Sequence, residues 1–280
     1  MKYRIAKFLF LPIILLFLFS SFSIYNYINK GEFFIRDLDL KGGTLISFIT
    51  DKEVSIDYIS LTLGEFREKV LISISKTENK YSIRITFPSE ISYEKIIEKL
   101  KNSEIKVEDL EIQFVGPELG SAFFSQVIYL LSMAYILIFL GNFFIYKKIS
   151  IATTIIFSSL ANIICIFGIT TLFGIPVSFA GFTSILLVIA YTIDDNVLLS
   201  TRILSGKPEE FYEQYKKSLI TGGTITSGLI ISMIIVLIFS NSPLLNNIAE
   251  ILLIGYASNM INTYILNAGI IEVSLFEKRS

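Results

Sequence analysis

Two adjacent carboxylates, Asp194 and Asp195, stand inside a segment that is otherwise apolar enough to cross a membrane. Placing a carboxylate in hydrocarbon costs about 2.5–3.5 kcal/mol on insertion scales, so such a residue in a membrane span usually has a function. The chain contains no histidine, the side chain that most readily exchanges a proton near neutral pH. Any proton coupling must therefore use carboxylates, and these two aspartates are the first candidates.

The two aspartates cannot face one cavity equally, because adjacent residues on a helix point about 100° apart. Arg202 follows Asp195 by two helical turns, so an ion pair between them is one structural reason for Asp195. Asp194 has no such partner on its own helix. We therefore predict that Asp194 is the functional carboxylate, with Asp195 as the alternative.

The composition indicates the membrane helices that must hold these carboxylates. Hydrophobic residues make up 52% of the 280 positions, charged residues make up 18%, and the mean hydropathy is +0.65. The formal net charge of −1 gives no basis for nucleic-acid binding. Six apolar runs are each close to the length of about 20 residues that crosses hydrocarbon as a helix. They cover residues 5–25, 123–146, 149–172, 177–199, 219–239 and 246–271.

A long polar insert, residues 26–120, separates the first apolar run from the second and holds 17 of the 25 acidic residues. Its periodicity predicts elements in the order β-α-β-β-α-β, the ferredoxin-like arrangement. The predicted strands are 44–50, 70–75, 81–87 and 105–114, and the predicted helices are 56–66 and 93–101. We expect a polytopic α-helical membrane protein with six transmembrane helices, one plus five, and a ferredoxin-like α/β extracytoplasmic domain between the first two.

Basic residues in the short connections predict the orientation, because cytoplasmic loops are enriched in Lys and Arg. The loops 173–176 and 240–245 carry no basic residue, whereas the connections on the other side carry Lys2, Arg4, Lys7, Lys147, Lys148, Arg202, Lys207, Lys216, Lys217, Lys278 and Arg279. We expect a multi-pass plasma-membrane protein with both termini cytoplasmic and the insert outside. The first run is predicted to be a retained helix, because bulky residues at 25–27 follow it in place of a cleavage pattern.

The expected domains follow from these runs. The first span lies in residues 1–25, the extracytoplasmic domain in 26–120, the five-helix membrane domain in 121–272 and a cytoplasmic tail in 273–280. Small residues crowd 221–228 and 255–259, which predicts close helix packing around the fourth run. The single cysteine, Cys165, lies in the third run and is predicted to pack there, so no intrachain disulfide braces the insert.

Two short elements flank the insert's first and last strands. A glycine pair before the first strand predicts a turn with positive φ. A Gly-Pro pair after the last strand breaks it before the chain enters the membrane. The elements contain Asp39, Gly42 and Gly43, and Val115, Gly116 and Pro117.

Taken together, these features resemble the SecD/SecF family, protein-export subunits related to proton-driven RND transporters. The chain keeps the residue order of that family's fourth transmembrane helix at Ile193, Asp194, Asp195, Val197, Leu198, Leu199, Arg202 and Ile203. The two flanking elements are similar to the family's D-x-x-G-G and V-G-P elements. The chain departs at Ser200 and Thr201, where bacterial members tend to carry an aromatic residue and an acid, and it is more similar to archaeal SecF.

The resemblance also bears on single residues. SecD-type members place their acid at the position of Asp194, and bacterial SecF places it at the position of Asp195. Lys217 falls where the family has a basic residue thought to take part in coupling. A Lys near a helix end can equally extend to the membrane interface, and we favour that role.

The resemblance implies a SecF-like auxiliary subunit, and not an enzyme, with no cofactor or metal. Such a subunit works with a SecD-like membrane partner beside the Sec translocon, using the proton gradient to help unfolded exported polypeptides cross the lipid bilayer. An RND-type protein needs a pseudo-twofold set of helices, and this chain supplies one half. Two alternatives stay open: a half-size RND-type permease for lipid or small molecules, and a non-conducting translocon scaffold.

Overall fold

The computed structural model describes residues 4–77, 80–88, 90–103, 105, 107–115, 117–240 and 242–277. The chain forms two compact units. The membrane unit contains the chain up to Ile35 and most of the chain after Tyr129, and the α/β unit consists mainly of Arg36–Ile128.

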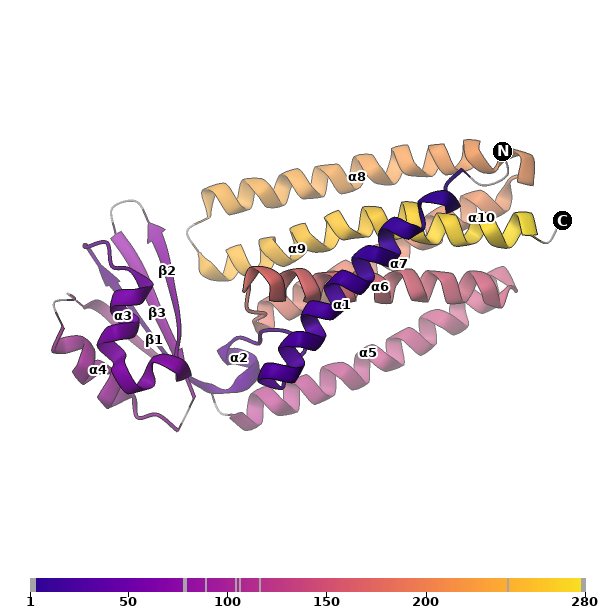
Figure 1. Ribbon diagram of the computed structural model, residues 1–280. Coiled ribbons are helices and arrows are strands. Elements are labelled where there is room, and N and C mark those ends of the chain that lie inside the picture. The colour runs from indigo at the N-terminus through magenta and orange to yellow at the C-terminus, as the bar shows by residue number, and fades with distance from the viewer. Residues whose placement is uncertain are drawn as a thin grey trace. The chain divides into compact units, whose positions relative to one another are not determined.

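Six helices of the described residues are long and apolar enough to cross a membrane, as the sequence predicts. They cover Ala6–Lys30, Phe124–Tyr146, Ile149–Phe173, Phe179–Ser205, Phe211–Phe239 and Leu244–Phe276. Their main elements are α1 (Phe10–Lys30), α5 (Pro117–Tyr146), α6 (Ile149–Phe173), α7 (Phe179–Ser205), α8 (Phe211–Phe239), α9 (Pro243–Ile261) and α10 (Ala268–Glu277) (Figure 1). A short 3-10 helix, η1 (Ala6–Phe8), precedes α1, and a π-helical segment, η4 (Asn262–Asn267), joins α9 to α10.

Local sequence explains where several of these helices begin and end. α1 continues past its apolar run to Lys30 and ends where Gly31 takes a φ of 74°. α7 begins at Phe179, after the N-cap residue Ser178, whose Oγ accepts a hydrogen bond from the backbone N of Gly181 at 3.1 Å. α8 begins at Phe211, well before the run predicted from residue 219, because the ring of Phe211 is buried.

α6 and α7 form the centre of the membrane unit. α1 packs on α6, α8 packs on α7, and the π-helical segment contacts both α6 and α7. Small residues permit the close contacts, since a Cβ on Gly168 would lie 2.4 Å from Cβ of Phe19 on α1. A Cβ on Gly255 would lie 2.5 Å from a methyl carbon of Val188 on α7. Membrane helices associate through such small residues because lipid tails supply no hydrophobic drive.

The α/β unit contains one four-stranded sheet with two helices and confirms the ferredoxin-like prediction. Its elements are α2 (Leu38–Lys41), β1 (Gly43–Thr50), α3 (Ile56–Leu63), the 3-10 helix η2 (Gly64–Lys69), β2 (Leu71–Thr77), β3 (Lys80–Phe87), α4 (Tyr93–Lys101) and β4 (Glu108–Val115). The strand order is β2-β3-β1-β4, and each neighbouring pair is antiparallel. This order and direction are those of a split β-α-β unit.

Alternation along the strands builds the core of this unit. Ile46 and Phe48 of β1 pair in register with Ile85 and Ile83 of β3, and all four side chains are fully buried. Ile59 and Leu63 of α3 and Ile96 and Leu100 of α4 complete the same cluster. Burying each such side chain is worth about 1.5–3 kcal/mol, which holds the helices on one face of the sheet.

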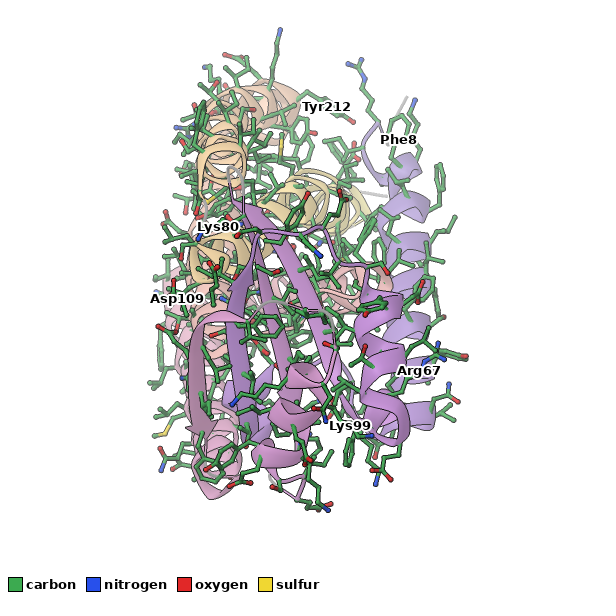
Figure 2. All side chains as sticks on the ribbon, turned by 90° about the vertical axis from the view of Figure 1, so that its left-hand side faces the viewer. Phe8, Arg67, Lys80, Lys99, Asp109 and Tyr212 are labelled. Carbon is green, nitrogen blue, oxygen red and sulfur yellow. The ribbon has the colours of Figure 1, made fainter. Side chains whose placement is uncertain are left out.

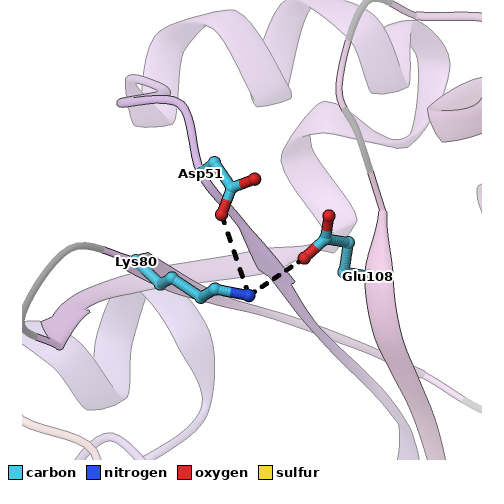
Figure 3. A network of polar contacts seen from close by, with 3 residues as sticks. All are labelled: Asp51, Lys80 and Glu108. Atoms are coloured by element: carbon cyan, nitrogen blue, oxygen red, sulfur yellow. Dashed lines mark hydrogen bonds and ion pairs between the residues drawn. The ribbon is translucent and has the colours of Figure 1, made fainter.

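Two lysines join elements at the margins of the sheet. Lys80 Nζ lies 3.1 Å from Glu108 Oε2 and 3.8 Å from Asp51 Oδ1, linking the ends of three strands (Figure 3). The hydrogen bond to Glu108 raises the pKa of Lys80 above its ordinary value. Lys99 of α4 donates to the backbone O of Leu63 at 3.1 Å and joins the two helices (Figure 2).

Candidate ion-coupling site in the membrane unit

Asp195 of α7 is the buried carboxylate at the centre of the membrane unit, with 5% of its surface exposed. Tyr264 donates its hydroxyl to Asp195 Oδ1 at 2.7 Å, and Asn259 donates its amide to Oδ2 at 3.0 Å. Thr263 donates to the amide oxygen of Asn259 at 2.9 Å and orients that amide. The carboxylate therefore has a donor on each oxygen, both supplied by the last membrane helix.

The π-helical segment explains how one helix supplies both donors. In an α-helix, Asn259 and Tyr264, five residues apart, would point about 140° away from each other. The π-helix has i→i+5 hydrogen bonds and a wider turn, which brings the two side chains toward the same side. Single π-helical turns within α-helices are frequent at functional sites.

Gly222 of α8 closes the site from the other side. A Cβ at this position would lie 1.8 Å from Tyr264 Oη and 2.7 Å from Asp195 Oδ1. Since contacts under 3.0 Å essentially never occur for a real Cβ, the Tyr264–Asp195 hydrogen bond requires glycine here. The small residues around 221–228 therefore include one whose lack of a side chain makes room for the carboxylate.

Other buried amides join α6, α7 and the last membrane helix in the same unit. Asn162 of α6 donates to Thr192 Oγ1 on α7 at 2.9 Å. Asn262, the first residue of the π-helical segment, donates to Asn162 Oδ1 at 3.4 Å. Asn267 donates at 2.6 Å to Oδ1 of Asn196, the residue next to Asp195 in the sequence. These hydrogen bonds join α6, α7 and the last helix, because breaking them would leave further buried amide groups without a partner.

The structure reverses the environments that we predict for the two aspartates. Asp194 is exposed on α7, and no hydrogen bond or ion pair to it is found among the described residues, whereas Asp195 lies among helices. The ion pair considered for Asp195 and Arg202 does not form. Asp195 accepts from Tyr264 of the last helix, and Arg202 donates to Thr221 Oγ1 at 3.0 Å. The sequence places both aspartates on the same helix but does not show which face of α7 is buried. Packing against the other helices decides that.

Lys217 lies away from the carboxylates, on the exposed surface of α8. Its Nζ is 2.7 Å from Glu213 Oε1, one turn earlier on the same helix. An exposed pair of this kind contributes about 0.3–0.5 kcal/mol. The geometry thus connects Lys217 with its own helix and not with Asp195.

The motif positions of the insert fall at the ends of its sheet. Gly42 and Gly43 have φ of 74° and 147° immediately before or at the start of β1, conformations that favour glycine. Val115 ends β4 and Pro117 begins α5. Asp39 lies in α2, and its side chain and the whole of Gly116 lie outside the described residues.

Sequence reasoning overlooks most partners of the carboxylate. Asn259 appears there only as one of several small residues, and Tyr264, Asn196 and Asn162 are not singled out. A signal was available, because asparagine is costly in a membrane span unless it is paired. Asn162, Asn196, Asn259, Asn262 and Asn267 all lie within the predicted apolar spans and are buried. Among the described residues, no three His, Cys, Asp or Glu side chains gather closely enough to hold a metal ion.

Comparison with known proteins shows the family of the chain. The model of the family described as "Protein export membrane protein SecD/SecF, C-terminal" matches residues 95–276, well over half of the chain. The chain belongs to the SecD/SecF family. Asp195, Gly222, Asn259 and Tyr264 all fall in the part of this SecD/SecF chain that matches.

Curated relatives are archaeal SecF proteins. The protein-export membrane protein SecF of Pyrococcus furiosus is 28% identical over 278 residues, which cover 97% of this chain and 92% of the relative. SecF of Methanocaldococcus jannaschii is 28% identical over 253 residues, covering 88% and 89%. These relatives carry the names of membrane proteins and not of enzymes. With its six membrane-length helices, this SecD/SecF chain is a multi-pass membrane protein.

Solved SecDF structures have the same fold. A crystal structure of SecDF, a translocon-associated membrane protein from Thermus thermophilus, matches all of this SecD/SecF chain with a TM-score of 0.79 at 17% identity. A SecDF structure in a super-membrane-facing form matches with a TM-score of 0.69 at 16% identity. The chain spans 39% of the length of each of these solved chains.

Proposed function

We propose that this chain is a SecF-type subunit that helps exported polypeptides cross the membrane, coupled to the proton gradient through Asp195. The observation that carries the proposal is a buried carboxylate with one donor on each oxygen, inside a membrane domain of the SecD/SecF family. Burial of a carboxylate in a membrane protein commonly marks an ion pathway. The names of the archaeal relatives support the export role.

The geometry around Asp195 suits a proton carrier. When the carboxylate is ionised, Tyr264 and Asn259 both donate to it. When it is protonated, its new O–H needs an acceptor, and one of the two donors must give way. A tyrosine hydroxyl can donate or accept, whereas an amide NH₂ can only donate. Protonation therefore changes the hydrogen bond to Tyr264 before the one to Asn259. Tyr264 lies in the π-helical segment that connects α9 with α10.

A SecD-like partner is part of the proposal. The chain spans 39% of the solved SecDF chains, so a second chain supplies a comparable set of helices. The exposed position of Asp194 supports the presence of a partner, because a carboxylate on the outer face of a membrane helix costs about 2.5–3.5 kcal/mol if it meets hydrocarbon. A partner with polar groups at this face removes that cost. We place both termini on the cytoplasmic side and residues 26–120 outside, from the distribution of basic residues.

The test is export into membrane vesicles that contain the chain, its SecD-like partner and the translocon, with and without an imposed proton gradient. Asp195→Asn keeps the volume and removes the proton cycle, so the gradient should no longer stimulate export while the complex still assembles. Asp194→Asn is the comparison variant: it keeps a polar side chain at the face that we assign to the partner, so the complex should assemble and export should respond to the gradient.

Two outcomes would contradict this assignment. If Asp194→Asn lost gradient-stimulated export and Asp195→Asn kept it, Asp194 would be the proton-coupling residue. Full stimulation in both variants would favour a translocon scaffold that conducts no protons.

A further inference from the structure

A cavity of about 370 Å³ opens between α1, α6 and α9 in the membrane unit. Its wall is almost entirely apolar. The lining residues are Leu15, Phe19, Cys165, Ile169, Leu253, Ile254, Ala257, Ser258, Ile261 and Asn262.

The cavity exists because α1 contacts the bundle closely at separate points. Phe19 lies directly against Gly168 of α6, and Leu9 lies directly against Gly269 of α10. Leu15, between these two contacts, borders the cavity. Ala257 is the exposed member of the wall, so the cavity opens past its methyl group to the surface of the helices.

The polar groups of the wall are already engaged within the chain. Ser258 donates to the backbone O of Ile254 at 2.7 Å. The Asn262 amide donates to Asn162 Oδ1 at 3.4 Å and contacts Cys165 Sγ at 3.8 Å. Ser258 and Asn262 therefore offer no spare donor to a peptide, a sugar or a phosphate headgroup, and the Cys165 thiol is only a weak donor. An apolar cavity of this kind stays dry and takes apolar guests.

The depth of the cavity decides which apolar guest reaches it. Leu15 and Phe19 lie near the middle of the span Ala6–Lys30, and Ala257 lies near the middle of Leu244–Phe276. The medium at that depth of a bilayer is hydrocarbon, and headgroups stay about half a membrane thickness away. The volume lies within the range of about 300–1,000 Å³ of small-molecule sites.

We propose that this cavity binds one hydrocarbon chain of a membrane lipid. The chain enters past Ala257 and lies between Leu15 and Ile261, with its end against Asn262. Asn262 begins the π-helical segment that carries Tyr264, so the bound chain packs against the element that positions the donors to Asp195. This inference does not depend on the export role, because it concerns lipid contact in the chain itself.

The test is photo-crosslinking in nanodiscs made with a lipid that carries a diazirine near the middle of one hydrocarbon chain. Mass spectrometry of the full-length chain should find label concentrated on peptides containing Leu15 and Phe19 and those containing residues 253–262. Ala257→Trp should block the entrance and lower this labelling at least about fivefold. Ala134→Trp, at an exposed alanine of α5 outside the cavity, should leave it unchanged.

Three results would overturn the proposal. Labelling spread evenly over all exposed helix faces would mean that no site exists. Equal labelling of the parent and of a folded Ala257→Trp protein, judged by an unchanged elution volume and melting temperature, would mean that the chain does not enter there. Loss of the label when a SecD-like partner is bound would assign the cavity to a side chain of that partner. Ile261→Trp, which fills the cavity from its wall, repeats the test if Ala257→Trp does not fold.

Discussion

Gly222 of α8 lies directly against Asp195 of α7, with no room for even one carbon atom between α8 and the carboxylate. The Cβ of any other residue would stand 2.7 Å from Asp195 Oδ1 and closer still to Tyr264 Oη. The proton site that we propose is therefore shaped by three helices at once, and the predictions below test its parts separately.

Gly222→Ala should displace Tyr264 or Asp195 and abolish gradient-stimulated export. Overpacking of this kind costs about 1–3 kcal/mol, so the melting temperature should also fall. Gly228→Ala, on the same helix, is the matched control, because its Cβ would meet nothing within 4 Å. It should leave export unchanged and stabilise the helix slightly. Equal behaviour of the two variants would show that the close approach at Gly222 is not needed.

Tyr264→Phe should weaken proton coupling without unfolding the protein. The substitution keeps the ring and removes the donor to Asp195, a hydrogen bond to a charged group worth about 1.5–3 kcal/mol. We expect proton flux through reconstituted vesicles, followed with a pH-sensitive dye, to fall about tenfold or more. Tyr256→Phe is the control, since the buried Tyr256 makes no hydrogen bond among the described residues through its hydroxyl. A parent-like flux in Tyr264→Phe would remove its hydroxyl from the proton path.

Glu272 of α10 is predicted to anchor the start of the first span. This fully buried carboxylate accepts the backbone N–H groups of Arg4, Ile5 and Ala6 at 2.7–2.9 Å and the hydroxyl of Tyr212, whose place in the unit Figure 2 shows. A carboxylate at free helix N–H groups satisfies donors that have no partner within the helix.

Glu272→Ala should therefore destabilise the chain by about 1–3 kcal/mol for each donor that stays buried without its acceptor. Amide hydrogen exchange at residues 4–6 should accelerate before exchange elsewhere. Glu250→Gln is the control, because no hydrogen bond of Glu250 is found in the part of the chain that the structure describes. Unchanged exchange at residues 4–6 in Glu272→Ala would argue against the anchor.

The Lys80 network should stabilise the α/β unit in a pH-dependent way. Its hydrogen bond to Glu108 raises the pKa of Lys80 above 10.5, so its contribution is fully present below pH 10.5 and is lost as pH rises through the folded-state pKa. Lys80→Met should lower the melting temperature slightly at pH 8, because exposed ion pairs are weak, and the difference from the parent should disappear as pH rises through the folded-state pKa of Lys80. Lys95→Met, at an exposed position of α4, should change nothing over the same pH range. A difference that persists above that pKa would point to a packing role for the Lys80 stem.

Several features of the fold could be predicted because they depend on local periodicity. The six apolar runs each correspond to a membrane-length helix, and α4 begins and ends at the residues that its spacing predicts. The strand order β2-β3-β1-β4 follows once the element order is known, since a split β-α-β unit has few alternatives. The length of a membrane span and the alternation of a strand depend only on residues that are close together in the sequence.

The sequence by itself determined that two carboxylates lie in the fourth apolar run and that no histidine could replace them. Only the tertiary structure decided that Asp195 turns inward and Asp194 outward, because that choice depends on which face of α7 meets the last helix. The partners Asn259 and Tyr264 come from 64 and 69 residues away, and a π-helical turn with no evident local signal aligns them. Contacts between distant segments depend on how whole helices pack against one another. No short stretch of residues predicts that packing.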